Sequence, residues 1–306
     1  MKKRTGARAV RRVQSIEWPT VALIVVCYAG WALALFWVAP RLPGMAVIIA
    51  GFAIALHASL IHEVLHGHPT PLIWLNELIM RLPLNLLYPY CRFRDLHLAH
   101  HRDSRLTDPY DDPESNYLDP EVWNRLAGGQ RLLLRVNNTL AGRMIVGPLV
   151  GTWAFLRSEM KLVRKGDLRV VAAWGLHLIG VALVMWIVAR SPMSIWGYFG
   201  AVYLGIAVLK VRTFLEHQAH EKARGRTVIV EDRGPLAFLF LNNNLHVVHH
   251  MHPNVAWYQL PALYRAGRDR FLAYNDGYVY RSYGEVFRRY LLRTKDPVAH
   301  PLWRRE

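Results

Sequence analysis

Uncharged apolar runs alternate with polar segments along the chain. Four of these runs hold no Asp, Glu, Lys or Arg: 18–40, 42–61, 171–189 and 191–209. About 20 apolar residues in a helix span the hydrocarbon core of a bilayer. The runs fall in two pairs with short connections, so we predict four transmembrane helices in two hairpins. The first run is too long for a cleaved signal peptide, and a second follows it almost at once.

The charge sets the expected orientation. The 306 residues include 38 basic and 22 acidic ones, which gives a net charge of +16. Basic residues favour the cytoplasmic side of a membrane and its anionic lipids. Several precede the first run: Lys2, Lys3, Arg4, Arg8, Arg11 and Arg12. We therefore expect both termini on the cytoplasmic side of a bacterial inner membrane, and no nucleic-acid partner.

The polar segments are expected to form a helical cap on the cytoplasmic side, so the predicted fold is all-α. Segment 71–90 is apolar but contains Glu77, Arg81 and three prolines, which favours an interfacial or re-entrant helix over a fifth span. Residues 260–293 mix aromatics, leucines and arginines at helical spacing, as surface helices do. We expect three parts: a basic N-terminus (1–17), a membrane domain (18–265) and an amphipathic cytoplasmic tail (266–306).

Histidines are clustered at the predicted cytoplasmic ends of these spans. Three clusters read HEVLHGH from His62, HLAHH from His97 and HVVHH from His246. Residues three and four apart share one face of a helix, so the histidines of each cluster point in similar directions. A looser pair, His217 and His220, follows the last apolar run.

Such groups are difficult to explain as ordinary core residues. Each buried imidazole needs a hydrogen-bond partner, and protonation of one would repel its neighbours. A metal ion solves both problems, because it binds the neutral imidazole nitrogen. The number of histidines exceeds the ligands of one zinc ion and suits two metals, with imidazole compatible with iron. The predicted ligands are His62, His66, His97, His100, His101, His246, His249 and His250.

Other polar residues near the clusters are candidates for supporting roles. Glu63, Asp95 and Asp103 adjoin the predicted ligands, and a carboxylate commonly accepts the distal N–H of a metal-bound imidazole. One of Asn242 to Asn244 holds a metal-bound water, or these residues cap the helix that carries His246. The remaining histidines have these expected roles: His220 as a second ligand or a surface group, His68 and His252 as structural or supporting residues, and His57 and His177 as neutral residues within spans.

Together these motifs resemble the membrane fatty acid desaturase family, which has a His-x-x-x-His box followed by two His-x-x-His-His boxes. The chain has HEVLHGH, with Glu63 where the family usually has Asp, then HLAHH with the acidic stretch DPYDDPE behind it, and then HVVHHMHP. The segment TFLEHQAH is similar to the family's TFLxH element, which points to His217 as a further ligand. The resemblance covers roughly residues 18 to 265.

The resemblance implies two iron ions that use O2 to attack a C–H bond of a lipid chain. It also implies an external electron donor such as ferredoxin, since Cys27 and Cys91 are too few for an iron–sulfur centre and no cytochrome b5-like HPGG element is present. The favoured function is an acyl-lipid desaturase of fatty acid biosynthesis. A lipid hydroxylase and a carotenoid ketolase or hydroxylase are alternatives on the same scaffold.

Two hypotheses from other classes remain open. The sequence His62-Glu63-x-x-His66 is also the HExxH motif of zinc metalloproteases, in which Glu63 would be the general base. This interpretation leaves both His-x-x-His-His boxes unexplained. A membrane protein that binds metal without catalysis is the second hypothesis, and an O2-dependent product would exclude it.

Overall fold

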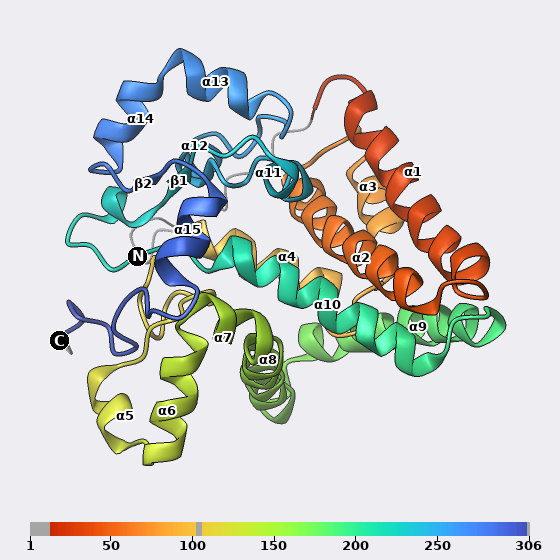
Figure 1. Ribbon diagram of the computed structural model, residues 1–306, viewed down its shortest axis with the longest axis horizontal. Coiled ribbons are helices and arrows are strands. Elements are labelled where there is room, and N and C mark those ends of the chain that lie inside the picture. The colour runs from red at the N-terminus through yellow and green to blue at the C-terminus, as the bar shows by residue number, and fades with distance from the viewer. Residues whose placement is uncertain (1–12, 102–105, 305–306) are drawn as a thin grey trace, which may run out of the picture.

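The computed structural model describes residues 13–101 and 106–304, and these form a mostly helical fold (Figure 1). Within these residues four helices are long and apolar enough to cross a membrane, which confirms the four predicted apolar helices. They are α1 with its π-helical continuation η1 (Trp18–Val38), α2 (Pro43–Leu65), α9 (Leu168–Arg190) and α10 (Ile195–Thr213). The basic stretch Lys2 to Arg12 and the candidate Asp103 lie outside the described residues.

Local sequence explains where these helices begin. Proline in the first turn starts both α1 and α2, where its missing N–H has no helical partner to lose. The side chain of Asp167 accepts hydrogen bonds from the first amides of α9, and Ser194 accepts one from Gly197 of α10. The starts of these helices are therefore encoded by residues at their own N-termini.

Helices α2 and α10 pack against each other at the centre of the bundle. Gly51 of α2 and Gly205 of α10 permit a close approach, because a Cβ atom at Gly205 would lie 2.9 Å from the carbonyl oxygen of Gly51. Small residues are typical of such helix contacts in membranes. The contact aligns the two helices, so that histidines at the end of α2 meet residues that follow α10.

Most of the remaining elements lie around the end of the bundle where α2 and α10 finish, whereas α3 lies beside α1 and α2 (Figure 1). The segment predicted as an interfacial helix forms the short helix α3 (Ile73–Met80) and then a turn. The other helices are α4 (Tyr90–His100), α5 (Pro120–Arg125), α6 (Gly128–Asn137), α7 (Leu140–Ile145), α8 (Gly147–Arg164), η3 (Ala223–Arg226), α11 (Pro235–Leu239), α12 (His246–Met251), α13 (Leu260–Ala266), α14 (Arg268–Tyr274) and α15 (Tyr283–Tyr290).

A small parallel sheet departs from the expected all-α fold. Strand β1 (Ile229–Val230) pairs with β2 (Val279–Tyr280), in the register Ile229 to Val279. The segment around β1 also bonds to the third histidine cluster, since Val247 N donates to the Val228 carbonyl and Val230 N donates to that of Asn244. The sheet thus fixes the start of the short helix α12, whose six residues would not be stable alone.

Candidate metal centre

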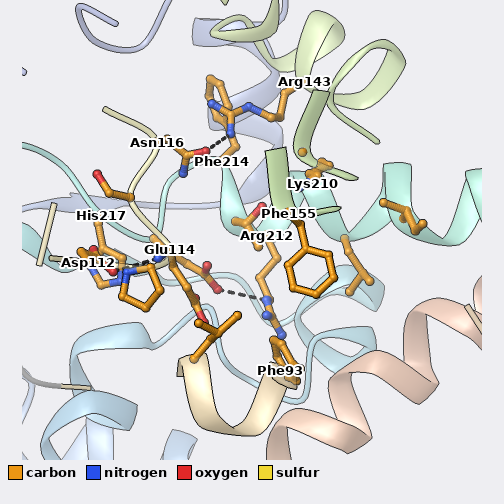
Figure 2. A pocket seen from close by; sticks show the side chains of 18 of the residues that line it. Phe93, Asp112, Glu114, Asn116, Arg143, Phe155, Lys210, Arg212, Phe214 and His217 are labelled. Carbon is orange, nitrogen blue, oxygen red and sulfur yellow. Dashed lines mark hydrogen bonds and ion pairs between the residues drawn. The ribbon is translucent and has the colours of Figure 1, made fainter. Parts of the chain in front are cut away.

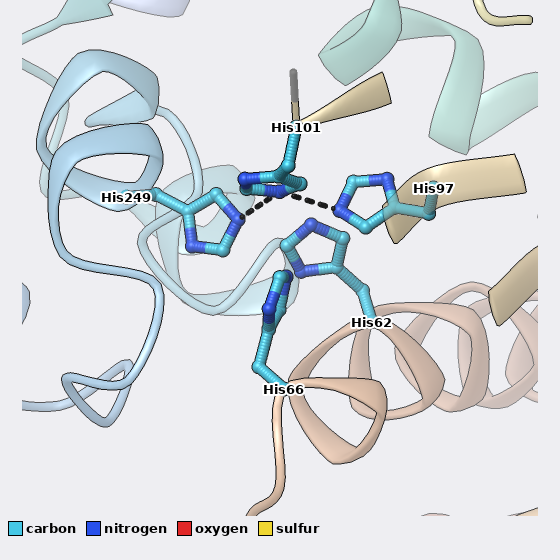
Figure 3. Close-up of side chains that lie close together, drawn as sticks. All are labelled: His62, His66, His97, His101 and His249. Carbon is cyan, nitrogen blue, oxygen red and sulfur yellow. Dashed lines mark hydrogen bonds between the residues drawn. The ribbon is translucent and has the colours of Figure 1, made fainter. Parts of the chain in front are cut away.

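Five histidines from three helices converge at the end of α2. His62 and His66 come from the last turn of α2, His97 and His101 from the end of α4, and His249 from α12 (Figure 3). One nitrogen atom from each lies within 4.8 Å of all the others. We call this group the five-histidine cluster. The arrangement can enclose a single metal ion.

Four further histidines form a second group beside the first. His100, His217, His246 and His250 each place one nitrogen atom within 4.8 Å of the others. We call this group the four-histidine cluster. The ring of His101 stacks on that of His250 with centroids 4.3 Å apart, so the two clusters share a boundary. Two clusters that are each able to bind a metal ion therefore lie side by side.

Both His-x-x-His-His boxes divide between the clusters. In the second box, His97 and His101 join the five-histidine cluster and His100 joins the other. In the third box, His246 and His250 enter the four-histidine cluster and His249 the other. Each residue turns an α-helix by about 100°. A residue four positions on therefore lies about 40° beyond one full turn, and a residue three positions on lies about 60° short of it. An i, i+4 pair can therefore face one metal while the i+3 residue faces the next.

Three of these histidines form a hydrogen bond from Nδ1 to a side-chain oxygen atom. His97 Nδ1 lies 2.9 Å from Glu114 Oε1, and His100 Nδ1 lies 2.7 Å from Asp112 Oδ1. His246 Nδ1 lies 3.1 Å from the side-chain oxygen of Asn243. In each case the ring N–H donates, which leaves Nε2 as the free acceptor. Such partners orient metal-binding histidines and make them more basic.

The Nε2 atoms face one another, and this arrangement fits bound metal ions. Those of His97 and His101 are 2.9 Å apart, and those of His100 and His217 are 2.8 Å apart. The buried Nε2 atoms of His62 and His66 have no hydrogen-bond partner among the described residues. Converging lone pairs in a buried site are unfavourable unless a cation binds them. The donor set therefore fits two histidine-rich metal sites.

Burial favours the neutral form that binds metal. Desolvation, helped by neighbouring imidazoles, holds the pKa well below its ordinary value for His66, His217, His246 and His249, and also lowers it for His101. At His100, burial would also lower the pKa, but the carboxylates of Glu114 and Asp112 outweigh it and raise the pKa to about 9. These two carboxylates favour positive charge there, which a metal ion would supply.

Two candidate residues next to the clusters serve another network. Glu63 Oε1 accepts the backbone N–H of Trp257 at 2.9 Å and lies 3.9 Å from His68 Nδ1. His68 Nδ1 is 2.8 Å from Glu17 Oε1. Neither Glu63 nor His68 belongs to a histidine cluster. Glu63 is therefore not positioned as a base beside His62 and His66, contrary to the metalloprotease hypothesis.

Three more candidates also lie away from the clusters. His220 Nδ1 contacts the Lys222 amide and carbonyl, and its other nitrogen is 3.8 Å from Asp276. Asp95 pairs with its neighbour Arg94 at 3.0 Å and is half exposed. The side chain of Asn242 donates to the Trp257 carbonyl. The supporting role expected for Asp95 falls to Asp112 and Glu114.

Sequence reasoning passed over Asp112, Glu114 and Asn243 as partners of specific histidines. The two carboxylates belong to the DPYDDPE stretch, which was noted only as an acidic loop. Its distance from the second box along the chain gives no sign that it folds back onto the helix. Asn243 stands three residues before His246, whose helix begins with no side-chain hydrogen bond to its N-terminus. The asparagine therefore supports the histidine instead of capping the helix.

A cavity of about 300 Å³ opens beside the clusters, between α4, α7, α8 and α10. His217, Asp112 and Glu114 line one side, and Phe93 and Phe155 line an apolar side (Figure 2). Glu114 Oε2 is also 3.9 Å from His100 Nε2, so this carboxylate stands between the clusters and the cavity. A molecule in the cavity would reach the edge of the metal sites.

These features define a helical protein of the membrane type with two adjacent histidine clusters able to bind metals. The chain matches the family model described as fatty acid desaturase over residues 39–282, and it belongs to that family. The protein is thus an enzyme of a non-haem di-iron oxidoreductase family, as the sequence predicted. A search of curated proteins found no match.

Proposed function

We propose that the enzyme is an O2-dependent di-iron desaturase that introduces a double bond into the alkyl chain of a fatty acyl lipid. The observation that carries this proposal is the pair of adjacent histidine clusters bordering a partly apolar cavity. Two iron ions held by the nine imidazoles would supply the oxidation of an unactivated C–H bond with O2. The family match supports both the metal and the lipid substrate.

The chain's own residues would position the substrate and the metals. Asp112, Glu114 and Asn243 fix the imidazoles by their Nδ1–H groups. Ile61, Leu96 and other apolar side chains of the cavity would bind the alkyl chain and exclude water, at about 0.8 kcal/mol per buried CH2 group. The walls of the cavity then determine which carbon comes nearest to the metals.

The proposal includes an orientation and an electron donor. Both clusters lie at the ends of α2 and α10 that the positive-inside rule assigns to the cytoplasm. Termini and metal sites would therefore face the cytoplasm of a bacterial inner membrane. An external donor such as ferredoxin would reach them from that side.

Lipid mass spectrometry tests the reaction. Cells that express the chain are compared with cells that express His249→Ala, and both are supplied with acyl lipids and carotenoid. A loss of two mass units in a lipid class, absent in the variant, would establish a desaturase. A gain of sixteen would establish a hydroxylase, and a gain of fourteen on a carotenoid a ketolase. No change in any supplied substrate, with iron and reduced ferredoxin present, would contradict the proposal.

A further inference from the structure

The cavity beside the metal sites contains more positive charge than the enzyme's alkyl-chain chemistry needs. Four cationic side chains line it: Arg143, Lys210, Arg212 and Lys295. An alkyl chain alone would bind best between apolar walls. Two of these cations have a carboxylate partner among the described residues, and two do not.

Two of the four are neutralised within the protein. Arg212 lies 3.0 Å from Glu216, and Lys295 lies 3.2 Å from Asp296. The other two carboxylates that line the cavity, Asp112 and Glu114, accept N–H groups of predicted metal ligands. No lining carboxylate is therefore left over for Arg143 and Lys210.

Arg143 and Lys210 have no carboxylate within ion-pair distance among the described residues. Arg143 is buried, and within the described residues its guanidinium donates to the Asn137 carbonyl and the Asn116 side chain. Burial lowers the pKa of Arg143 to about 10, so it stays charged at neutral pH. Lys210 is partly buried, and its ammonium has no hydrogen-bond partner in the described part of the chain. Unpaired charge of this kind is costly unless an anion joins it.

Helix α8 brings these two cations together. A Cβ atom at Gly147 would lie 3.1 Å from Arg143 Cδ, and one at Gly151 would lie 3.0 Å from Lys210 Nζ. Gly147 and Gly151 are one turn apart on a single face of α8, a separation of about 6 Å. The Arg143 side chain, at Cδ, and the Lys210 ammonium therefore lie against the first turns of an 18-residue helix, whose N-terminus also favours negative charge.

We propose that Arg143 and Lys210 bind the anionic end, a carboxylate or a phosphate, of the substrate. The alkyl chain would then lie on the apolar wall formed by residues such as Phe93 and Phe155. Figure 2 shows Arg143 and Lys210 along one margin of the cavity, with His217 and Glu114 across from them. The inference rests on the proposed function and assigns its substrate class: a single-chain amphiphile with a charged end, whose oxidised carbon faces the metals.

Binding measurements test this without any turnover. The full-length, iron-loaded chain in phosphatidylcholine nanodiscs is titrated with labelled palmitate, methyl palmitate and hexadecyl phosphate. We expect at least one anion to bind about ten-fold more tightly than the neutral ester, a difference of about 1.4 kcal/mol. Preference for palmitate identifies a carboxylate end, and preference for hexadecyl phosphate identifies a phosphate end.

Substitutions then locate the preference. Lys210→Met should remove most of the roughly ten-fold selectivity, while Lys161→Met on the exposed face of α8 should leave it unchanged. Gly151→Ala keeps the charge but crowds the ammonium, so it should lower the selectivity by less. Equal binding of ester and anions, or unaltered selectivity in both Lys210→Met and Gly151→Ala, would overturn the inference.

The result of these binding measurements can be distinguished from the result that tests the proposed function. Anion-selective binding with no oxidised product would keep this site and remove the desaturase proposal. An oxidised lipid product, together with equal binding of the ester and the anions, would keep the desaturase proposal and remove this site. Thermal unfolding of each variant, recorded in the same nanodiscs, separates lost binding from lost folding.

Discussion

The two histidine clusters use the same helical spacing but differ in their surroundings. The five-histidine cluster is held by two histidines of the central helix α2 and by both His-x-x-His-His boxes. The four-histidine cluster has one imidazole fewer, and its His217 lines the cavity. The comparison teaches that the four-histidine cluster borders the cavity through His217, whereas no histidine of the five-histidine cluster is among the residues that line it.

Removing one predicted ligand from each cluster tests this difference, and we expect it to have the largest effect on iron content and turnover. His246→Ala leaves three imidazoles in the four-histidine cluster, so we expect about half of the iron to be lost. Turnover should fall roughly 1000-fold, as expected when about 4 kcal/mol of metal-derived stabilisation is lost. His66→Ala leaves four imidazoles in the other cluster and should retain more iron. Elemental analysis with a turnover assay measures both, and equal iron loss in the two variants would contradict the distinction.

The carboxylates behind the imidazoles should give the next largest effect. Asp112→Ala should weaken iron binding about 10- to 100-fold through His100, as such partners commonly do. Asp112 also accepts the backbone N–H groups of Thr107 and Glu114, so the loop becomes less ordered as well. Competition with a chelator measures the affinity. Asp95→Ala is the matched control, and an equal loss there would contradict the assignment of Asp112.

Histidines outside the clusters should leave the metal content unchanged. His68→Gln removes the contact with Glu17 at 2.8 Å and should cost about 1 kcal/mol of stability, since a buried partner is lost. His220→Gln, at a partly exposed position, should change neither stability nor iron. Iron content and thermal unfolding are measured for both. Loss of iron in His220→Gln would place that residue among the ligands.

Glu63→Gln should have only a small effect on turnover. The glutamine carbonyl can still accept the Trp257 N–H, so we expect turnover within about five-fold of the unchanged enzyme, or roughly 1 kcal/mol. A general base of a metalloprotease would instead be essential. Turnover on the lipid substrate checks this prediction, and a loss of several orders of magnitude would show that Glu63 takes part in the chemistry.

Features that depend on local pattern were predictable from the sequence. Four apolar runs gave the four long helices, because the spans are defined by uninterrupted hydrophobicity. The spacing within each box indicated convergence of the eight box histidines, all of which lie in the two clusters, together with His217. The spans and the shared direction of the histidines within each box follow from hydropathy and helix geometry, whereas His217 was indicated by the resemblance of TFLEHQAH to the family's TFLxH element.

Features that depend on distant contacts were not predictable. The split of both His-x-x-His-His boxes between the two clusters arises because His249 crosses to meet α2 while His100 crosses to meet the segment after α10. The role expected for Asp95 went to Asp112 and Glu114, since a loop folds back onto α4. The β1–β2 pair joins segments about fifty residues apart, and two-residue strands leave no alternating pattern to detect.

The spread of the ligands along the chain has a consequence for biosynthesis. The ligands extend from His62 to His250, and each cluster includes residues from α4 or its end and from α12. Neither site can be complete until the last of these residues has left the ribosome. The four helices that are apolar enough to cross a membrane would therefore be made before either site is complete, and metal loading would be the closing step of maturation. A cell that makes the enzyme faster than it supplies metal would accumulate inserted but immature chains.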